Sequence, residues 1–134
     1  NNVQGACDMG GLPNVLTGYQ PVTLGAASKK FADAWGVDEL PTQIGLTIPE
    51  MLSGIEEEKV HALWVMGENP VVSDPDADHV VKALEKVDLL IVQDIFLTPT
   101  ARLADVVLPG CSFAEKDGTF VNTERRITRV RKAV

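Results

Sequence analysis

The sequence contains few cysteines and no long apolar run, and each shortage excludes a class of protein. Its 134 residues include only Cys7 and Cys111, which form no CxxC pair, so neither a disulfide framework nor a tetrahedral zinc site is expected. Each cysteine is predicted to be a small buried side chain. No apolar run approaches the roughly 20 residues that cross a bilayer, and no signal-peptide pattern is present. We therefore expect a cytoplasmic chain without membrane contact.

Signatures of catalysis and of nucleic-acid binding are also missing. The formal net charge of −7 argues against a nucleic-acid surface. The sequence has no GxSxG nucleophile motif. His61 and His79 have no cysteine or carboxylate at metal-ligand spacing, and Asp76 and Asp78 are typical of a solvated surface. The sequence therefore predicts no catalytic residue and no metal ligand within this chain.

The length is typical of one domain, and the pattern of apolar runs predicts an α/β fold. The apolar runs 62–66 and 89–92 flank a helical stripe over 74–88, which has a helix-start signal at its Asp-Pro pair. Two strands joined by one helix predict a parallel pair with a right-handed crossover. A third buried strand over 105–108 completes a β-α-β-α-β core at 60–111. We expect a Rossmann-like parallel sheet flanked by helices.

The segments outside this core are predicted to be simpler. Residues 1–22 are rich in Gly, Pro and Asn, which indicates a loop with one short helical turn. A helix is predicted over 26–35, and a second helix after Thr47, where Glu50 completes a capping box. The first of these helices is predicted to end at Gly36 and to turn three side chains inward, Phe31, Ala34 and Trp35. Residues 119–134 alternate as one basic, two-faced C-terminal strand.

Polar residues follow each of the three core strands. They are Gly67, Glu68 and Asn69 after the first strand, Gln93 and Asp94 after the second, and Gly110 and Cys111 after the third. Parallel strands end at one edge of a sheet, and ligands of open α/β sheets bind there. A carboxylate accepts from adjacent N–H donors of a purine, and glycine lets a flat ligand approach the backbone. The alternative is that these are ordinary turn residues and helix caps.

Five motifs in order carry a family resemblance. They are NNVQGACDMG at 1–10, MGENP at 66–70, IVQDIF at 91–96, ADVVLP at 104–109 and GTFVNTERR at 118–126. Together they resemble the catalytic (alpha) subunit of molybdenum- or tungsten-dependent formate dehydrogenases, within the molybdopterin oxidoreductases of the dimethyl-sulfoxide-reductase family. The resemblance implies that residues 1–134 are a fragment of a much longer subunit and lie in its third, Rossmann-like domain.

The resemblance also implies a cofactor and its contacts. In the intact enzyme it would be bis-molybdopterin guanine dinucleotide with Mo or W. Five residues, Gly67, Asn69, Ser73, Gln93 and Asp94, would line the guanosine and diphosphate site, with Gly110 and Cys111 beside them. Relatives often have Asp at position 69, which leaves Asp94 or Glu68 as the carboxylate that binds guanine. Residues 1–22 would approach the metal end of the cofactor, and Cys7 would not be the metal ligand.

The implied activity is oxidation of formate to carbon dioxide, with electrons passed to iron–sulfur centres. The 4Fe–4S cluster would lie in an N-terminal domain outside this chain, and the fragment itself would not be catalytic. Its partners would be the remaining domains of the subunit and the electron-transfer subunits. The alternatives are a nitrate reductase, a formylmethanofuran dehydrogenase, or a structural domain without cofactor, as in the large subunit of respiratory complex I.

Overall fold

The computed structural model describes residues 2–134, which form two compact units. One unit comprises Asn1–Leu46 and Asp117–Arg131, and the other comprises Thr47–Lys116 and Lys132–Val134. Among the described residues, no helix is long and apolar enough to span a membrane. The three-stranded sheet and all the predicted site residues belong to the second unit.

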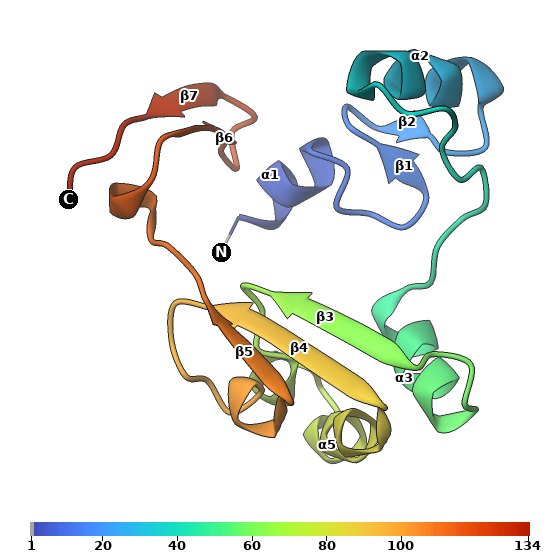
Figure 1. The fold of residues 1–134 in the computed structure, drawn as a ribbon, viewed down its shortest axis with the longest axis vertical. Coiled ribbons are helices and arrows are strands. Elements are labelled where there is room, and N and C mark those ends of the chain that lie inside the picture. The colour runs from blue at the N-terminus through green and yellow to red at the C-terminus, as the bar shows by residue number, and fades with distance from the viewer. Residues whose placement is uncertain (1) are drawn as a thin grey trace. The chain divides into compact units, whose positions relative to one another are not determined.

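A three-stranded parallel sheet organises the second unit (Figure 1). Its strands are β3 (Ala62–Met66), β4 (Leu89–Asp94) and β5 (Val106–Pro109), in the spatial order β3-β4-β5. The unit also contains α3 (Ile48–Glu56), α4 (Pro70–Ser73), α5 (Ala77–Lys86), and the 3-10 helices η1 (Ala101–Leu103) and η2 (Phe113–Glu115). This arrangement confirms the predicted α/β fold with a parallel sheet.

One face of this sheet carries the core. The buried side chains there are Leu52, Ile55, Val80, Ala83, Leu84, Val87, Leu90, Val92 and Ala101. They come from α3, α5, β4, η1 and the turn before β4, and Figure 1 shows α3 and α5 on the same side of the sheet. Burial of each large aliphatic side chain contributes about 1.5–3 kcal/mol. On the other face, Trp64 is 54% exposed and Met66 is 63% exposed.

The structure corrects several predicted boundaries in this unit. β4 continues through Gln93 and Asp94 instead of ending before them, because these residues pair with β3 and β5. The helix begins at Ala77, later than predicted, because Asp76 caps it by accepting from the His79 amide at 3.1 Å. The short helix α4 occupies part of the predicted loop, and Ser73 is its last residue.

The third strand is also less buried than predicted. Its residues Val106, Val107 and Leu108 are 38–42% exposed. β5 lies at one end of the described sheet and hydrogen-bonds to β4 alone within residues 2–134, so its outer side has no strand beside it. The prediction of a buried strand is therefore wrong for β5.

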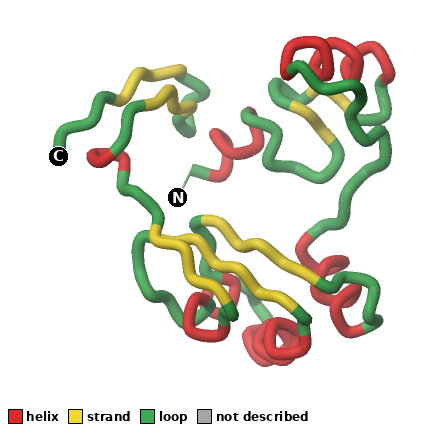
Figure 2. Tube along the Cα trace, in the orientation of Figure 1, coloured by secondary structure: helices red, strands yellow, loops and turns green. Residues whose placement is uncertain are grey.

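Within residues 2–134, the first unit contains two small helices and two hairpins. The helices are α1 (Val3–Asp8) and α2 (Gly25–Trp35), and the antiparallel pairs are β1 (Val15–Leu16) with β2 (Gln20–Pro21) and β6 (Gly118–Val121) with β7 (Ile127–Val130). The predicted single strand over 119–134 is wrong, because the chain turns between β6 and β7 (Figure 2). In that turn the Arg125 amide donates to the Asn122 carbonyl at 2.9 Å, and Arg125 has φ of +63°.

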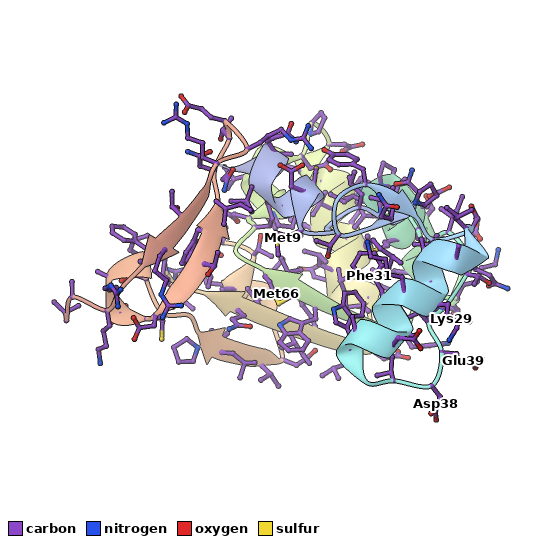
Figure 3. The ribbon with its side chains drawn as sticks, turned by 90° about the horizontal axis from the view of Figure 1, so that it is seen from above. Met9, Lys29, Phe31, Asp38, Glu39 and Met66 are labelled. Atoms are coloured by element: carbon purple, nitrogen blue, oxygen red, sulfur yellow. The ribbon has the colours of Figure 1, made fainter. Side chains whose placement is uncertain are left out.

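Helix α2 ends as predicted but buries different residues. Gly36 is left-handed, with φ of +68°, which ends the helix. Its buried residues are small, Ala27, Ser28 and Ala32, whereas Ala34 is exposed and Trp35 is 54% exposed. Phe31, labelled in Figure 3, is half-buried and packs against Trp35 with ring centroids 5.1 Å apart. The predicted inward set is therefore wrong, because small side chains form the contact surface.

The cysteine prediction also fails. Cys7 is half-buried and Cys111 is exposed, so neither is the small buried side chain that the sequence suggested. Both thiols are free. The capping box at Thr47 is confirmed, because the Thr47 amide donates to Glu50 Oε2 at 2.7 Å.

Candidate functional site

The carboxyl ends of β3, β4 and β5 meet, as the parallel arrangement predicts. Met66 is in register with Gln93, and Asp94 is in register with Pro109. The ladder continues one step further, because the Gly67 amide donates to the Gln93 carbonyl at 2.9 Å and the Gly110 amide donates to the Asp94 carbonyl at 2.9 Å. The structure therefore brings together Gly67, Gln93, Asp94 and Gly110, and we call this place the carboxyl edge.

The two glycines of the carboxyl edge differ in backbone conformation and in the space around them. Gly67 has φ of +63°, a conformation that disfavours other residues, and a Cβ added to it would meet no atom within 4 Å. Its backbone is therefore open to an approaching group. A Cβ on Gly110 would lie 3.4 Å from the Asp94 carbonyl carbon, which is ordinary contact. The backbone conformation thus favours glycine at position 67, and the surroundings of Gly110 tolerate a small side chain.

Two carboxylates lie at the carboxyl edge, and only one of them is held. The half-buried Asp94 accepts a hydrogen bond from the Phe96 amide through Oδ1, at 3.0 Å. Within residues 2–134 its Oδ2 has no hydrogen-bond partner and is available to a ligand. Glu68 is exposed and makes neither a hydrogen bond nor an ion pair in the described part of the chain. Asp94 is therefore the preorganised acceptor.

The side chain of Asn69 is directed to another loop. Its Oδ1 accepts from Thr100 Oγ1 at 2.7 Å and from the Thr100 amide at 3.3 Å. Ser73 in turn donates its hydroxyl to the Asn69 carbonyl at 3.2 Å. Thr100 is fully buried, and sequence reasoning missed it because the only signal was a Thr-Pro-Thr loop. Both Asn69 and Ser73 therefore make contacts that shape α4 and its entry.

Sequence reasoning also missed an apolar surface immediately after Asp94. Ile95, Phe96 and Leu97 are 52%, 70% and 59% exposed, although large apolar side chains of this kind usually lie in a hydrophobic core. Cys111, which follows Gly110, is exposed as well. Exposed aromatic and aliphatic groups beside a carboxylate suit a ligand that is flat and has N–H donors on its rim. The run Ile-Phe-Leu after a polar strand end was the available sequence signal.

Both histidines lie against carboxylates away from this edge. His61 Nδ1 lies 2.9 Å from Asp88 Oδ2, and His79 Nε2 lies 3.3 Å from Glu56 Oε1. A shallow hollow near the amino ends of β3 and β4 is lined by Ile55, Glu58, Val60, His61, Lys86 and Asp88. No group of three or more His, Cys, Asp or Glu residues suited to a metal ion occurs within residues 2–134.

The resolved pKa shifts belong to exposed surface groups. The Thr47 hydroxyl and amide lower the pKa of Glu50, and the Ser112 amide and hydroxyl lower the pKa of Glu115. Both glutamates occupy capping boxes at helix starts, so their shifts come from local hydrogen bonds. They indicate helix capping at these two positions and identify no acid–base pair.

The parallel sheet and its carboxyl edge define a Rossmann-like α/β domain of the kind that binds nucleotide-containing ligands at its strand ends. The profile of the molybdopterin oxidoreductase family matches residues 1–134. This chain belongs to the molybdopterin oxidoreductase family. The resemblance noted in the sequence is thereby confirmed.

Several similar proteins are named as formate dehydrogenases. Over 134 residues the chain is 63% identical to the alpha subunit of F420-dependent formate dehydrogenase 1 of Methanococcus maripaludis. It is 60% identical to the F420-dependent formate dehydrogenase alpha subunit of Methanocaldococcus jannaschii and 48% identical to formate dehydrogenase H of Escherichia coli. In each case the whole chain is matched and spans 19% of the relative's length.

Proposed function

We propose that this chain is the cofactor-binding segment of the catalytic subunit of a formate dehydrogenase. The family membership and the whole-chain identity to three formate dehydrogenase subunits support this function. The chain spans 19% of the length of those relatives, and we expect the catalytic groups in other segments of the longer subunit. The observation that supports the proposal is the carboxyl edge, where an open glycine backbone and a preorganised carboxylate stand at the ends of neighbouring strands.

The residues of the carboxyl edge fit the guanine dinucleotide half of a molybdopterin cofactor. The free Oδ2 of Asp94 can accept from the N–H groups of guanine, and the exposed ring of Phe96, two residues further along the chain, offers a flat apolar surface. The Gly67 backbone leaves room for a ribose or phosphate. Gln93 lies on the same strand end as Asp94, and Gly110 and Cys111 follow the neighbouring strand β5. When bound, the cofactor supplies the metal centre at which formate is oxidised.

The start of α5 is a poor place for the diphosphate. Asp74, Asp76 and Asp78 surround it, and their negative charges repel phosphate. We therefore expect the diphosphate to bind along the backbone of residues 67–68 and near Ser73, whose hydroxyl donates to the Asn69 carbonyl at 3.2 Å. This arrangement leaves the α5 start as a capped, solvated helix end.

A substitution of Asp94 tests the guanine contact. In the full-length subunit, Asp94→Ala should lower the guanine nucleotide released per polypeptide, measured by mass spectrometry after acid hydrolysis. The loss of a hydrogen bond to a charged acceptor weakens binding by roughly tenfold or more. Asp88→Ala is the matched control, because Asp88 is an exposed aspartate at the amino end of β4. Unchanged guanine content in Asp94→Ala would contradict the assignment.

Activity and metal content test the wider proposal. The full-length subunit should reduce a viologen dye with formate, whereas the 134-residue chain alone should not; turnover by the chain alone would refute its non-catalytic role. Two of the relatives are named F420-dependent, so F420 is the first natural acceptor to test. Metal and iron analysis should find Mo or W with bis-molybdopterin guanine dinucleotide, and a 4Fe–4S cluster bound outside this chain.

The longer reading frame and its product separate this function from its rivals. An upstream CxxC cluster, together with a Cys or selenocysteine followed by His, is expected for a formate dehydrogenase. We further propose electron-transfer subunits as partners and the cytoplasm as the compartment, which copurification and cell fractionation test. Nitrate or formylmethanofuran turnover would favour another member of the family, and a subunit without bound pterin would favour a structural domain.

A further inference from the structure

Asn69 is placed where a ligand contact was expected, yet its side-chain oxygen is already engaged. Oδ1 accepts from both the hydroxyl and the amide of Thr100, at 2.7 Å and 3.3 Å. We propose that Asn69 is a positioning residue, which fastens the loop after β3 to the loop after β4 and thereby sets the shape of the carboxyl edge. This inference rests on the proposed function and assigns a role within it.

The burial of Thr100 makes this link strong. Thr100 is 0% exposed, and its Oγ1 accepts from the Val71 amide at 3.2 Å while donating to Asn69. A buried hydroxyl or amide that loses its partner is costly, so the two loops stay together while these hydrogen bonds exist. The next residue, Ala101, is 1% exposed and belongs to the core cluster. The link therefore joins the α4 entry to a part of the fold that cannot move freely.

The link controls the residues that would bind the cofactor. Gly67 and Glu68 immediately precede Asn69, and the exposed run 95–97 lies between Asp94 and Thr100. Both ends of each binding loop are then fixed: one end by the parallel ladder and the other by the Asn69–Thr100 hydrogen bonds. Without this link, residues 67–69 and 95–100 would be held at their strand ends alone.

Substitutions at position 69 distinguish a positioning role from a direct contact with the ligand. An aspartate there has an oxygen in the same place and can accept both hydrogen bonds from Thr100, but it lacks the amide donor that a ligand contact would use. Leucine has similar volume and accepts nothing. Thr100→Val removes the hydroxyl from the other side of the link while leaving Asn69 intact.

The experiment compares variants of the full-length subunit. Asn69→Leu and Thr100→Val should each lower retained guanine nucleotide by a similar factor, on the order of fivefold to tenfold. The double variant should retain at least as much nucleotide as the single variant that retains less. Asn69→Asp should retain guanine nucleotide at the wild-type level. Hydrogen exchange followed by mass spectrometry should show faster exchange in peptides covering 67–73 and 95–103 for Asn69→Leu and Thr100→Val.

A core variant separates positioning from general instability. Val80→Ala creates a small cavity at a fully buried site of α5 and lowers the melting temperature without touching the link. If retention in all variants simply follows melting temperature, positioning is overturned. It is also overturned if Asn69→Asp loses the nucleotide while Thr100→Val keeps it, because that pattern means direct contact through the amide. A wild-type subunit without guanine nucleotide overturns the proposed function itself, whatever the exchange data show.

Discussion

The ion pair between Asp8 and Arg125 should hold the first unit together. The Asp8 side chain is 9% exposed, and its two oxygens accept from Arg125 Nε at 3.2 Å and Nη2 at 3.0 Å. The Arg125 guanidinium also lies 5.7 Å from the centre of the Tyr19 ring. Because Asp8 ends α1 and Arg125 lies between β6 and β7, this pair joins segments from the two ends of the chain.

The stability lost when Arg125 is replaced by alanine follows from the unequal burial of the two partners. Removal of one partner from a fully buried pair costs about 3–5 kcal/mol, whereas an exposed pair is worth about 0–1 kcal/mol. Arg125 is 63% exposed, so solvent screening places Arg125→Ala nearer the lower range. With the ring contact included, we expect a loss of about 2 kcal/mol. Alanine keeps the backbone strain at φ of +63° unchanged, so the difference reports the side chain.

The assay needs a probe in the right unit. The chain has two tryptophans, Trp35 in the first unit and Trp64 in the second, so a Trp64→Phe background makes Trp35 the reporter of the first unit. Urea unfolding should shift its midpoint down by about 1 M, given a slope of about 2 kcal/mol per molar. In a double-mutant cycle with Asp8→Ala, the coupling energy should be about 1–2 kcal/mol. A coupling below about 0.5 kcal/mol would refute the reasoning.

Three further predictions concern the second unit. Leu84→Ala, at a side chain that is 2% exposed, should lower stability by about 3 kcal/mol in urea unfolding followed through Trp64; a loss below about 1 kcal/mol would mean that α5 is not docked as described. The Thr47 hydrogen bonds lower the pKa of Glu50 from its ordinary value of 4.5, so this stabilisation is present above that value and is lost as the pH falls through the lower, folded pKa. The melting temperature of Glu50→Gln should therefore fall less steeply than that of the wild type as the pH is lowered. An equal dependence on pH would exclude this cap as a source of acid sensitivity. Trp64→Glu should reduce the fluorescence of a bound apolar dye such as ANS, because Trp64 and Met66 form part of the exposed sheet face; equal fluorescence would place the dye elsewhere.

The parallel core could be predicted because its strands are short apolar runs between strong punctuation. Ala62–Met66 stops at Gly67, and the helical stripe ends before Leu89, so the local pattern and the tertiary structure agree. The strand ends could not be placed as well. Gln93 and Asp94 are polar but continue β4, because both neighbouring strands supply hydrogen-bond partners that a local pattern does not reveal.

The first unit was harder to predict because its contacts depend on unusual local conformations. The hairpin between β6 and β7 contains no Asn-Gly or Asp-Gly signal, and its left-handed residue is Arg125. An arginine with positive φ is uncommon, so the alternating residues were interpreted as one strand. Similarly, Trp35 was expected to point inward as a large apolar residue, whereas Ala32 and its small neighbours make the buried surface of α2.

The position of the candidate site followed from topology, but the direction of each side chain did not. Parallel strands necessarily bring Gly67, Asp94 and Gly110 to one edge, and the structure has them there. Whether Asn69 faces a ligand or the protein depends on Thr100, which is 31 residues away in the chain. Amide and carboxylate side chains suit both environments, so composition alone leaves that choice open.

Three polar side chains at or beside the carboxyl edge, Glu68, Asn69 and Asp94, also differ in the conformational entropy that they would lose on binding a ligand. Both acceptor hydrogen bonds of Asn69 Oδ1 come from Thr100, so its rotamer is already fixed by the protein. Glu68 is exposed and would lose its side-chain freedom on binding a ligand. Asp94 is intermediate, since Oδ1 is held by the Phe96 amide and Oδ2 remains available to a ligand. A carboxylate held through one oxygen has already lost part of its side-chain freedom, and its second oxygen still has lone pairs for a ligand. For that reason, substitution of Asp94 should weaken guanine binding more than substitution of Glu68.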